Sequence, residues 1–185
     1  VFLLSIYFSN QILGFYALVI KVFLLPISIL SRTIGTANYK YLTDLTHNNQ
    51  KIFSYVLKLT ISLFSLTIIP IICCYYFAEP FIIFVFGKDW SYSAKILQIL
   101  STGYALKFVA LTLFETAYPI KLIKTLSIWK FVSTLIFLTV CLSYLNFYEF
   151  DNFGFFHLLN SLELIINFFL IAMILYKAKK YDERI

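Results

Sequence analysis

The sequence predicts an all-α protein, a polytopic bundle of transmembrane helices with about five complete spans plus the end of one more. Three observations predict this fold class. Of the 185 residues, 61% are hydrophobic, a share far above that of a soluble domain. Only 13% are charged, and the mean hydropathy is +0.87. The apolar runs between the charged segments also reach the ~20 residues that a helix needs to cross the hydrocarbon core of a bilayer.

The first complete span is predicted at residues 12–31, after an apolar opening that we interpret as the end of a preceding span. Pro26 lies inside this first span and is expected to kink it, which a helix bundle tolerates. Residues 36–50 are polar and carry asparagine, threonine, lysine and aspartate. We therefore expect a cytoplasmic loop there, with room for a short helix on the membrane surface.

The second span is predicted at residues 54–78, with Pro70 inside it. Pro80 is expected to begin a separate short helix, because proline suits the first turn of a helix. A turn is expected at residues 86–90, with Trp90 at the membrane interface, where aromatic side chains are enriched. The remaining spans are predicted at residues 93–118, ended by Pro119, and at 125–146 and 153–176. No segment resembles a flexible linker, so we expect one domain over residues 1–185.

The charges of the segments between the spans predict the orientation of the chain. In chain order these segments are basic, near neutral, basic, acidic and basic. Short loops rich in lysine and arginine stay on the cytoplasmic side of a membrane. On this rule the C-terminus is cytoplasmic, and most of the basic residues fall in segments predicted to be inside: Arg32, Lys40, Lys51, Lys58, Lys121, Lys124, Lys130, Lys177, Lys179, Lys180 and Arg184. The segments predicted to be outside hold Glu79, Lys88, Asp89, Lys95, Glu149 and Asp151.

Lys21, Lys107 and Glu163 fall near the middle of predicted spans, where a charge costs at least about 2.5 kcal/mol. Such residues usually face the interior of a bundle or a watery cavity. At 100° per helical residue, Lys21 shares a stripe with Ser28 and Arg32, among others. We therefore predict an aqueous cavity lined by polar residues of several spans: Lys21, Arg32, Lys107, Asn160, Glu163 and Asn167.

One alternative interpretation of these charges stays open, and the fourth span needs a separate comment. Lys21 or Lys107 could pair with Glu163 and serve only to hold the bundle together. The fourth span, residues 125–146, lacks a clear polar stripe, so we expect it to be peripheral to the cavity.

The sequence offers no argument for an enzyme. It contains no glycine-rich phosphate loop, no nucleophile elbow and no HExxH motif. Cys73, Cys74 and Cys141 lie in apolar runs without metal-ligand spacing, so we expect no metal and no cofactor. The formal net charge is +6, but the basic residues lie at span ends rather than in a stripe with stacking aromatics, which argues against nucleic acid.

Three motifs carry a resemblance to a known family. Gly14-Phe15-Tyr16-Ala17, followed by Lys21 and Pro26, resembles the family's entry to its eighth helix, which contains glycine, tyrosine, alanine and a basic residue. Residues 80–90 resemble its P-x-I-x-x-x-F-G-x-x-W segment between helices nine and ten, and Phe153-Gly154 its entry to the last helix. In this order the motifs resemble the C-terminal half of a Wzx-type polysaccharide (O-antigen repeat unit) flippase of the multidrug/oligosaccharidyl-lipid/polysaccharide exporter superfamily.

The resemblance implies a twelve-helix transporter of two lobes, with residues 1–185 as the C-terminal six-helix lobe. It also implies a central cationic cavity, with Lys21 at a matched basic position. The expected function is a flippase that moves polyprenyl-diphosphate-linked O-antigen or capsule repeat units across the bacterial inner membrane. The expected partners are this lipid-linked oligosaccharide, membrane lipids and an N-terminal lobe of the same protein, and other polysaccharide assembly proteins are candidates.

Two other functions stay open at this point. A lipid II flippase or a multidrug exporter would share the fold, although exporters of organic cations would favour intramembrane carboxylates over lysines. A membrane-embedded polysaccharide polymerase or ligase is the alternative from another class. Such an enzyme usually needs a large external loop, and the longest predicted outside segment, residues 79–92, is too short to suit it.

Overall fold

The computed structural model describes residues 7–116, 118–119, 122–147 and 152–185. These residues form helices joined by short connections, with no strand among them. The elements are α1 (Asn10–Val19), the π-helical turn η2 (Ile20–Leu24), α2 (Leu25–His47), α3 (Phe53–Phe86), the 3-10 turn η3 (Lys88–Trp90), α4 (Ser91–Thr116), α5 (Ile123–Phe147) and α6 (Asn152–Asp182). Five helices are long and apolar enough to cross a membrane, with α1, η2 and α2 counting as one. The predicted fold class is confirmed.

The first span is longer than its apolar run. Helix continues without a break from Asn10 to His47, so the prediction of a loop from residue 36 was wrong. Residues 36–47 are polar but contain no proline or glycine, and polarity alone does not end a helix. At 1.5 Å per residue, this helix is about 57 Å long, well beyond the ~30 Å hydrocarbon core. The polar half of α2 therefore projects past the hydrocarbon core.

The prolines are accommodated inside helices. Ahead of Pro26 the helix widens into η2, where the Leu25 N–H donates to the Ile20 carbonyl five residues back. The prediction of a new helix at Pro80 was wrong, because α3 runs through both Pro70 and Pro80. A proline interrupts the hydrogen-bond ladder, and membrane helices repair this with neighbouring groups. The Gln98 side chain of α4 donates to the Tyr75 carbonyl at 2.9 Å and so joins α4 to α3 in this region.

The turn after α3 explains the motif at residues 80–90. Gly87 ends the helix with a φ of +94°, a conformation that favours glycine. The chain then turns through η3, and the Trp90 ring packs edge-on against Phe15 of α1 with ring centroids 5.7 Å apart. The residues of this motif thus end one span and anchor the turn against another.

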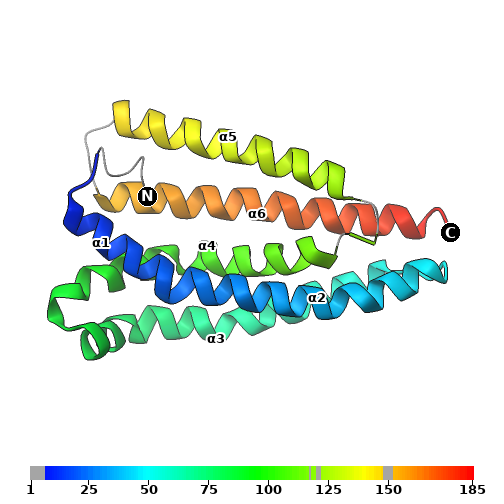
Figure 1. The fold of residues 1–185 in the computed structure, drawn as a ribbon, viewed down its shortest axis with the longest axis horizontal. Coiled ribbons are helices and arrows are strands. Elements are labelled where there is room, and N and C mark those ends of the chain that lie inside the picture. The colour runs from blue at the N-terminus through cyan, green and yellow to red at the C-terminus, as the bar shows by residue number, and fades with distance from the viewer. Residues whose placement is uncertain (1–6, 117, 120–121, 148–151) are drawn as a thin grey trace.

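Helix α4 is the centre of the bundle. Its most apolar window is 67% buried, whereas the corresponding windows of the other spans are 11–33% buried. Helices α1, α2, α3 and α6 pack against it, and α5 packs mainly against α6 at the edge (Figure 1). The fourth span thus lies at the edge of the bundle, but the expectation that it stays away from the polar cavity was wrong, because Lys130 and Ser133 of α5 line that cavity.

The two ends of the bundle differ in charge. The α2–α3 and α4–α5 connections and the C-terminus lie at one end, shown at the right of Figure 1. We call this the basic end, because it carries Lys51, Lys124, Lys177, Lys179, Lys180 and Arg184. The opposite end carries Glu79, Lys88 and Asp89. Lys121, Glu149 and Asp151, which also entered the charge pattern, lie outside the described residues.

Side chains in the C-terminal turn of α6 form hydrogen bonds to α2 and to the start of α3 at the basic end. The Asp182 carboxylate accepts hydrogen bonds from the backbone N–H groups of Ile52 and Phe53, at 2.8 and 3.1 Å. It thereby caps the N-terminus of α3, whose first N–H groups have no partner within the helix. One residue earlier, the Tyr181 hydroxyl donates to the Thr46 carbonyl of α2 at 3.2 Å.

Candidate functional site: a polar cluster between α4, α5 and α6

A glycine lets α4 and α6 approach closely within the membrane. A Cβ atom at Gly103 would lie 2.5 Å from the Asn160 Oδ1 and 3.2 Å from the Glu163 Cβ, so only glycine fits without displacement. The same Asn160 Oδ1 accepts a hydrogen bond from the Gly103 N–H at 2.8 Å. The amide nitrogen of Asn160 donates to the Thr102 hydroxyl at 3.0 Å. Small residues serve this purpose in membrane bundles, because they bring two backbones together.

One helical turn further along, an ion pair joins the same two helices. The Lys107 Nζ and the Glu163 Oε1 are 2.5 Å apart, and their side chains are 20% and 17% exposed. The second carboxylate oxygen accepts from the Asn167 Nδ2 at 2.9 Å, and this nitrogen also donates to the Glu163 carbonyl at 2.7 Å. Two neighbours therefore hold the Glu163 carboxylate in place.

The ion pair borders a cavity that also involves α5. The cavity has a volume of about 170 Å³ and is lined by Lys107, Glu163 and Asn167 together with Lys130 and Ser133 of α5. Sequence reasoning missed Lys130 as a member of this site, because it counted this lysine with the basic segment before the fourth span. The signal that could have identified it is its position about two turns inside α5, which begins at Ile123.

The structure brings together four of the six residues predicted to line one cavity. Asn160, Glu163 and Asn167 share one face of α6, as predicted, and Lys107 meets them from α4. Lys21 and Arg32 are exposed on the helix formed by α1, η2 and α2, outside this cluster. Lys21 lies in η2 and forms no ion pair with any of the described residues. Of the two lysines considered as partners of Glu163, the structure selects Lys107.

The cluster has the electrostatics of a site for anions. Two lysines and one carboxylate leave one positive charge at the small cavity. A charge within a membrane persists where water or a partner offsets its desolvation, and both the ion pair and the cavity do so here. The chemistry available is charge attraction and hydrogen bonding by the lysine ammonium groups, because the Ser133 hydroxyl already donates to the Lys130 carbonyl at 3.0 Å.

Comparison with known families gives one match. A family model described as "Polysaccharide biosynthesis protein" matches residues 1–95, which cover α1, α2, α3 and the first turn of α4. No curated protein and no solved structure matches the chain.

Proposed function

Because the chain belongs to the polysaccharide biosynthesis protein family, we propose that it is a flippase for polyprenyl-diphosphate-linked oligosaccharides. It would carry the sugar head group of an O-antigen or capsule repeat unit across the bacterial inner membrane while the lipid tail stays in the bilayer. The observation that carries the proposal is the family match on a chain built from five helices that are able to span a membrane.

The form of the chain favours transport over catalysis. The connections at the end proposed to be external are short: α4 begins five residues after the end of α3, and α6 begins five residues after the end of α5. A membrane-embedded polymerase or ligase would need a larger external segment for its catalytic groups. Lysines in the membrane, with Lys21 exposed and Lys107 and Lys130 at the cavity, suit a substrate that carries phosphate.

In this proposal the chain is the C-terminal lobe of a two-lobe transporter of the Wzx type. Two lobes that move against each other around a central site would give alternating access. The exposed Lys21 and Arg32 would then face the space between the lobes, and the N-terminal lobe would be their partner surface.

The test is lipid flipping by the full-length protein in liposomes. Lipid-linked oligosaccharide is incorporated in both leaflets, and an impermeant glycosidase trims the sugars that reach the outside. Complete trimming with protein, and trimming of about half without it, would support the proposal. Trimming of half in both cases, or elongation of the glycan instead of its movement, would refute it, and elongation would favour the polymerase.

The proposed orientation places the basic end in the cytoplasm, following the positive-inside rule. It is tested in a variant whose cysteines are replaced, with one new cysteine at either Lys51 or Lys88. Both positions are exposed lysines beside an end of α3, at opposite ends of the bundle. An impermeant thiol reagent should label Lys88→Cys and spare Lys51→Cys in intact cells. Labelling in the reverse pattern would overturn the orientation.

A further inference from the structure

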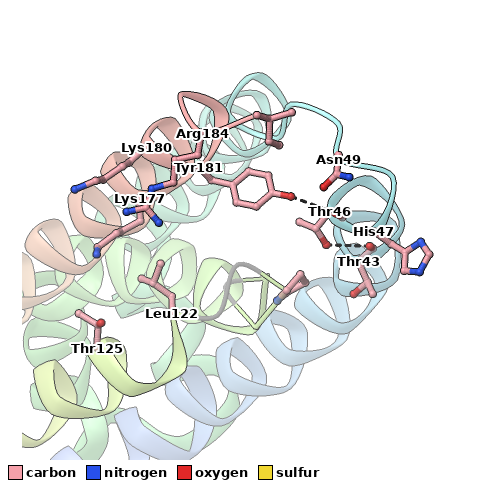
Figure 2. Close-up of a pocket in the computed structure, with 12 residues that line it drawn as sticks. Thr43, Thr46, His47, Asn49, Leu122, Thr125, Lys177, Lys180, Tyr181 and Arg184 are labelled. Carbon is pink, nitrogen blue, oxygen red and sulfur yellow. Dashed lines mark hydrogen bonds between the residues drawn. The ribbon is translucent and has the colours of Figure 1, made fainter.

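A second, larger pocket lies at the basic end, away from the polar cluster. It has a volume of about 780 Å³ and lies between the C-terminal turns of α2 and α6 and the α4–α5 connection. Figure 2 shows Lys177 and Lys180 extending from α6 and Arg184 from the turn after it, with Thr43 and Thr46 of α2 across the opening. This volume is within the range of about 300–1,000 Å³ that is usual for small-molecule sites.

The lining of this pocket is cationic. Lys177 and Lys180 are three residues apart, which puts them on one face of α6, and Arg184 follows in the turn just after the helix. No aspartate or glutamate side chain is among the described residues that line the pocket. The neighbouring Asp182 is engaged elsewhere, because its two oxygens accept the backbone hydrogen bonds from Ile52 and Phe53. The charged side chains among the described residues that line the pocket are therefore all cationic.

The pocket lies at the level where lipid head groups are found. Helix α6 has no charged residue from Leu164 to Tyr176, and Lys177 is its first charge after this apolar run. Tyr181 lines the pocket one turn later, as expected of the aromatic residues that mark a membrane interface. Basic pockets between membrane helices at the cytoplasmic surface bind phosphate-bearing head groups.

We propose that this pocket binds the phosphate-bearing head group of a membrane lipid. The lysine ammonium groups and the arginine guanidinium would bind the phosphate oxygens. Two lipids share this chemistry: an anionic phospholipid of the bilayer, and the polyprenyl diphosphate of the transported substrate. The second source rests on the proposed function, and the first does not.

The test measures the Kd of lipids for the full-length protein in an uncharged detergent. The probes are a polyprenyl diphosphate, phosphatidylglycerol, phosphatidylcholine and inorganic pyrophosphate. The pocket variant carries Lys177→Gln, Lys180→Gln and Arg184→Gln. The matched control carries Lys51→Gln, Lys124→Gln and Lys179→Gln, which removes the same charge from exposed positions of the same end outside the pocket.

The pocket variant should bind the preferred lipid at least about tenfold more weakly, a loss expected from removing charge-assisted hydrogen bonds. The control should change the Kd by less than about threefold, since exposed charges are screened. Equal losses in both variants would mean diffuse attraction to the basic end and would overturn the proposal. Binding of inorganic pyrophosphate alone, without either anionic lipid, would also overturn it.

The lipid arms separate the two sources. Tight binding of polyprenyl diphosphate with weak binding of phosphatidylglycerol would identify a substrate site, and comparable binding of both would identify a general site for anionic lipids. If liposome flipping fails while phosphatidylglycerol still binds, the proposed function falls and this inference stands. Should the pocket variant unfold, Lys180→Gln alone, at an exposed position, must still weaken binding by about threefold.

Discussion

Removing the ion pair one residue at a time should cost more stability than removing it whole. The Lys107 Nζ and the Glu163 Oε1 are 2.5 Å apart. At an effective dielectric constant of about 20, their Coulomb attraction is about 6–7 kcal/mol. Desolvation of the two ions offsets much of this attraction. Loss of one partner from a buried pair costs about 3–5 kcal/mol, and an unpaired charge within a membrane costs about 2.5–3.5 kcal/mol by insertion.

Because water reaches side chains that are 20% and 17% exposed, we expect Glu163→Leu to lower the free energy of unfolding by about 2–4 kcal/mol. Lys107→Leu should cost less, because Lys130 lines the same cavity and remains to offset the Glu163 carboxylate. The double variant Lys107→Leu/Glu163→Leu should approach the stability of the unaltered protein, since no unpaired charge is left. Asn167 would keep its hydrogen bond to the backbone carbonyl of residue 163.

The assay is unfolding in mixed micelles of all four proteins, together with their membrane abundance and their flipping rate in liposomes. If the pair serves transport, the double variant should be abundant and inactive. If it serves structure alone, the double variant should be abundant and active. A double variant that is as unstable as Glu163→Leu, or single variants that each cost less than about 0.5 kcal/mol, would refute the reasoning, because either result means that no unpaired charge is created.

Three further predictions concern positions outside the cluster. Lys21→Ala should abolish export, measured as surface polysaccharide, while the abundance of the protein in the membrane stays nearly unchanged. Lys21→Arg should retain part of the export activity. Normal export by Lys21→Ala would remove this residue from the site. Asp182→Ala should lower the free energy of unfolding by about 1 kcal/mol, because α3 loses its cap. Unfolding measurements and faster amide exchange at the start of α3 would show this. The control Glu183→Ala, at the exposed neighbouring position, should change neither. Gly35→Ala should lower the free energy of unfolding by about 1–3 kcal/mol, because the new Cβ would lie 2.6 Å from a side-chain atom of α4. Gly14→Ala, whose Cβ would have nothing within 4 Å, should be neutral or stabilising. Equal effects of the two variants would contradict the close approach of α2 and α4.

Much of the fold follows from the sequence, because hydropathy acts residue by residue. Each apolar side chain favours the bilayer independently of its neighbours, so runs of about 20 residues mark the spans without any knowledge of contacts. The five spans were predicted in this way, and helical periodicity predicted that Asn160, Glu163 and Asn167 share one face. The missing polar stripe of the fourth span did not keep it from the cavity, because Lys130 and Ser133 line it. The errors lie at helix ends: nothing in residues 36–47 stops a helix, and Pro80 is tolerated within one.

The candidate site depended on the tertiary structure. Periodicity places a lysine on a stripe but does not say which helix faces it, and Lys107 and Glu163 are 56 positions apart in the chain. Lipid is as apolar as the helix surfaces, so helix pairing depends on close packing at small residues such as Gly35 and Gly103 rather than on hydropathy. The sequence by itself therefore determined that the chain enters a membrane and where it crosses. Packing between helices decided that α4 is central, that Lys107 rather than Lys21 meets Glu163, and that Asp182 caps a helix 130 residues away.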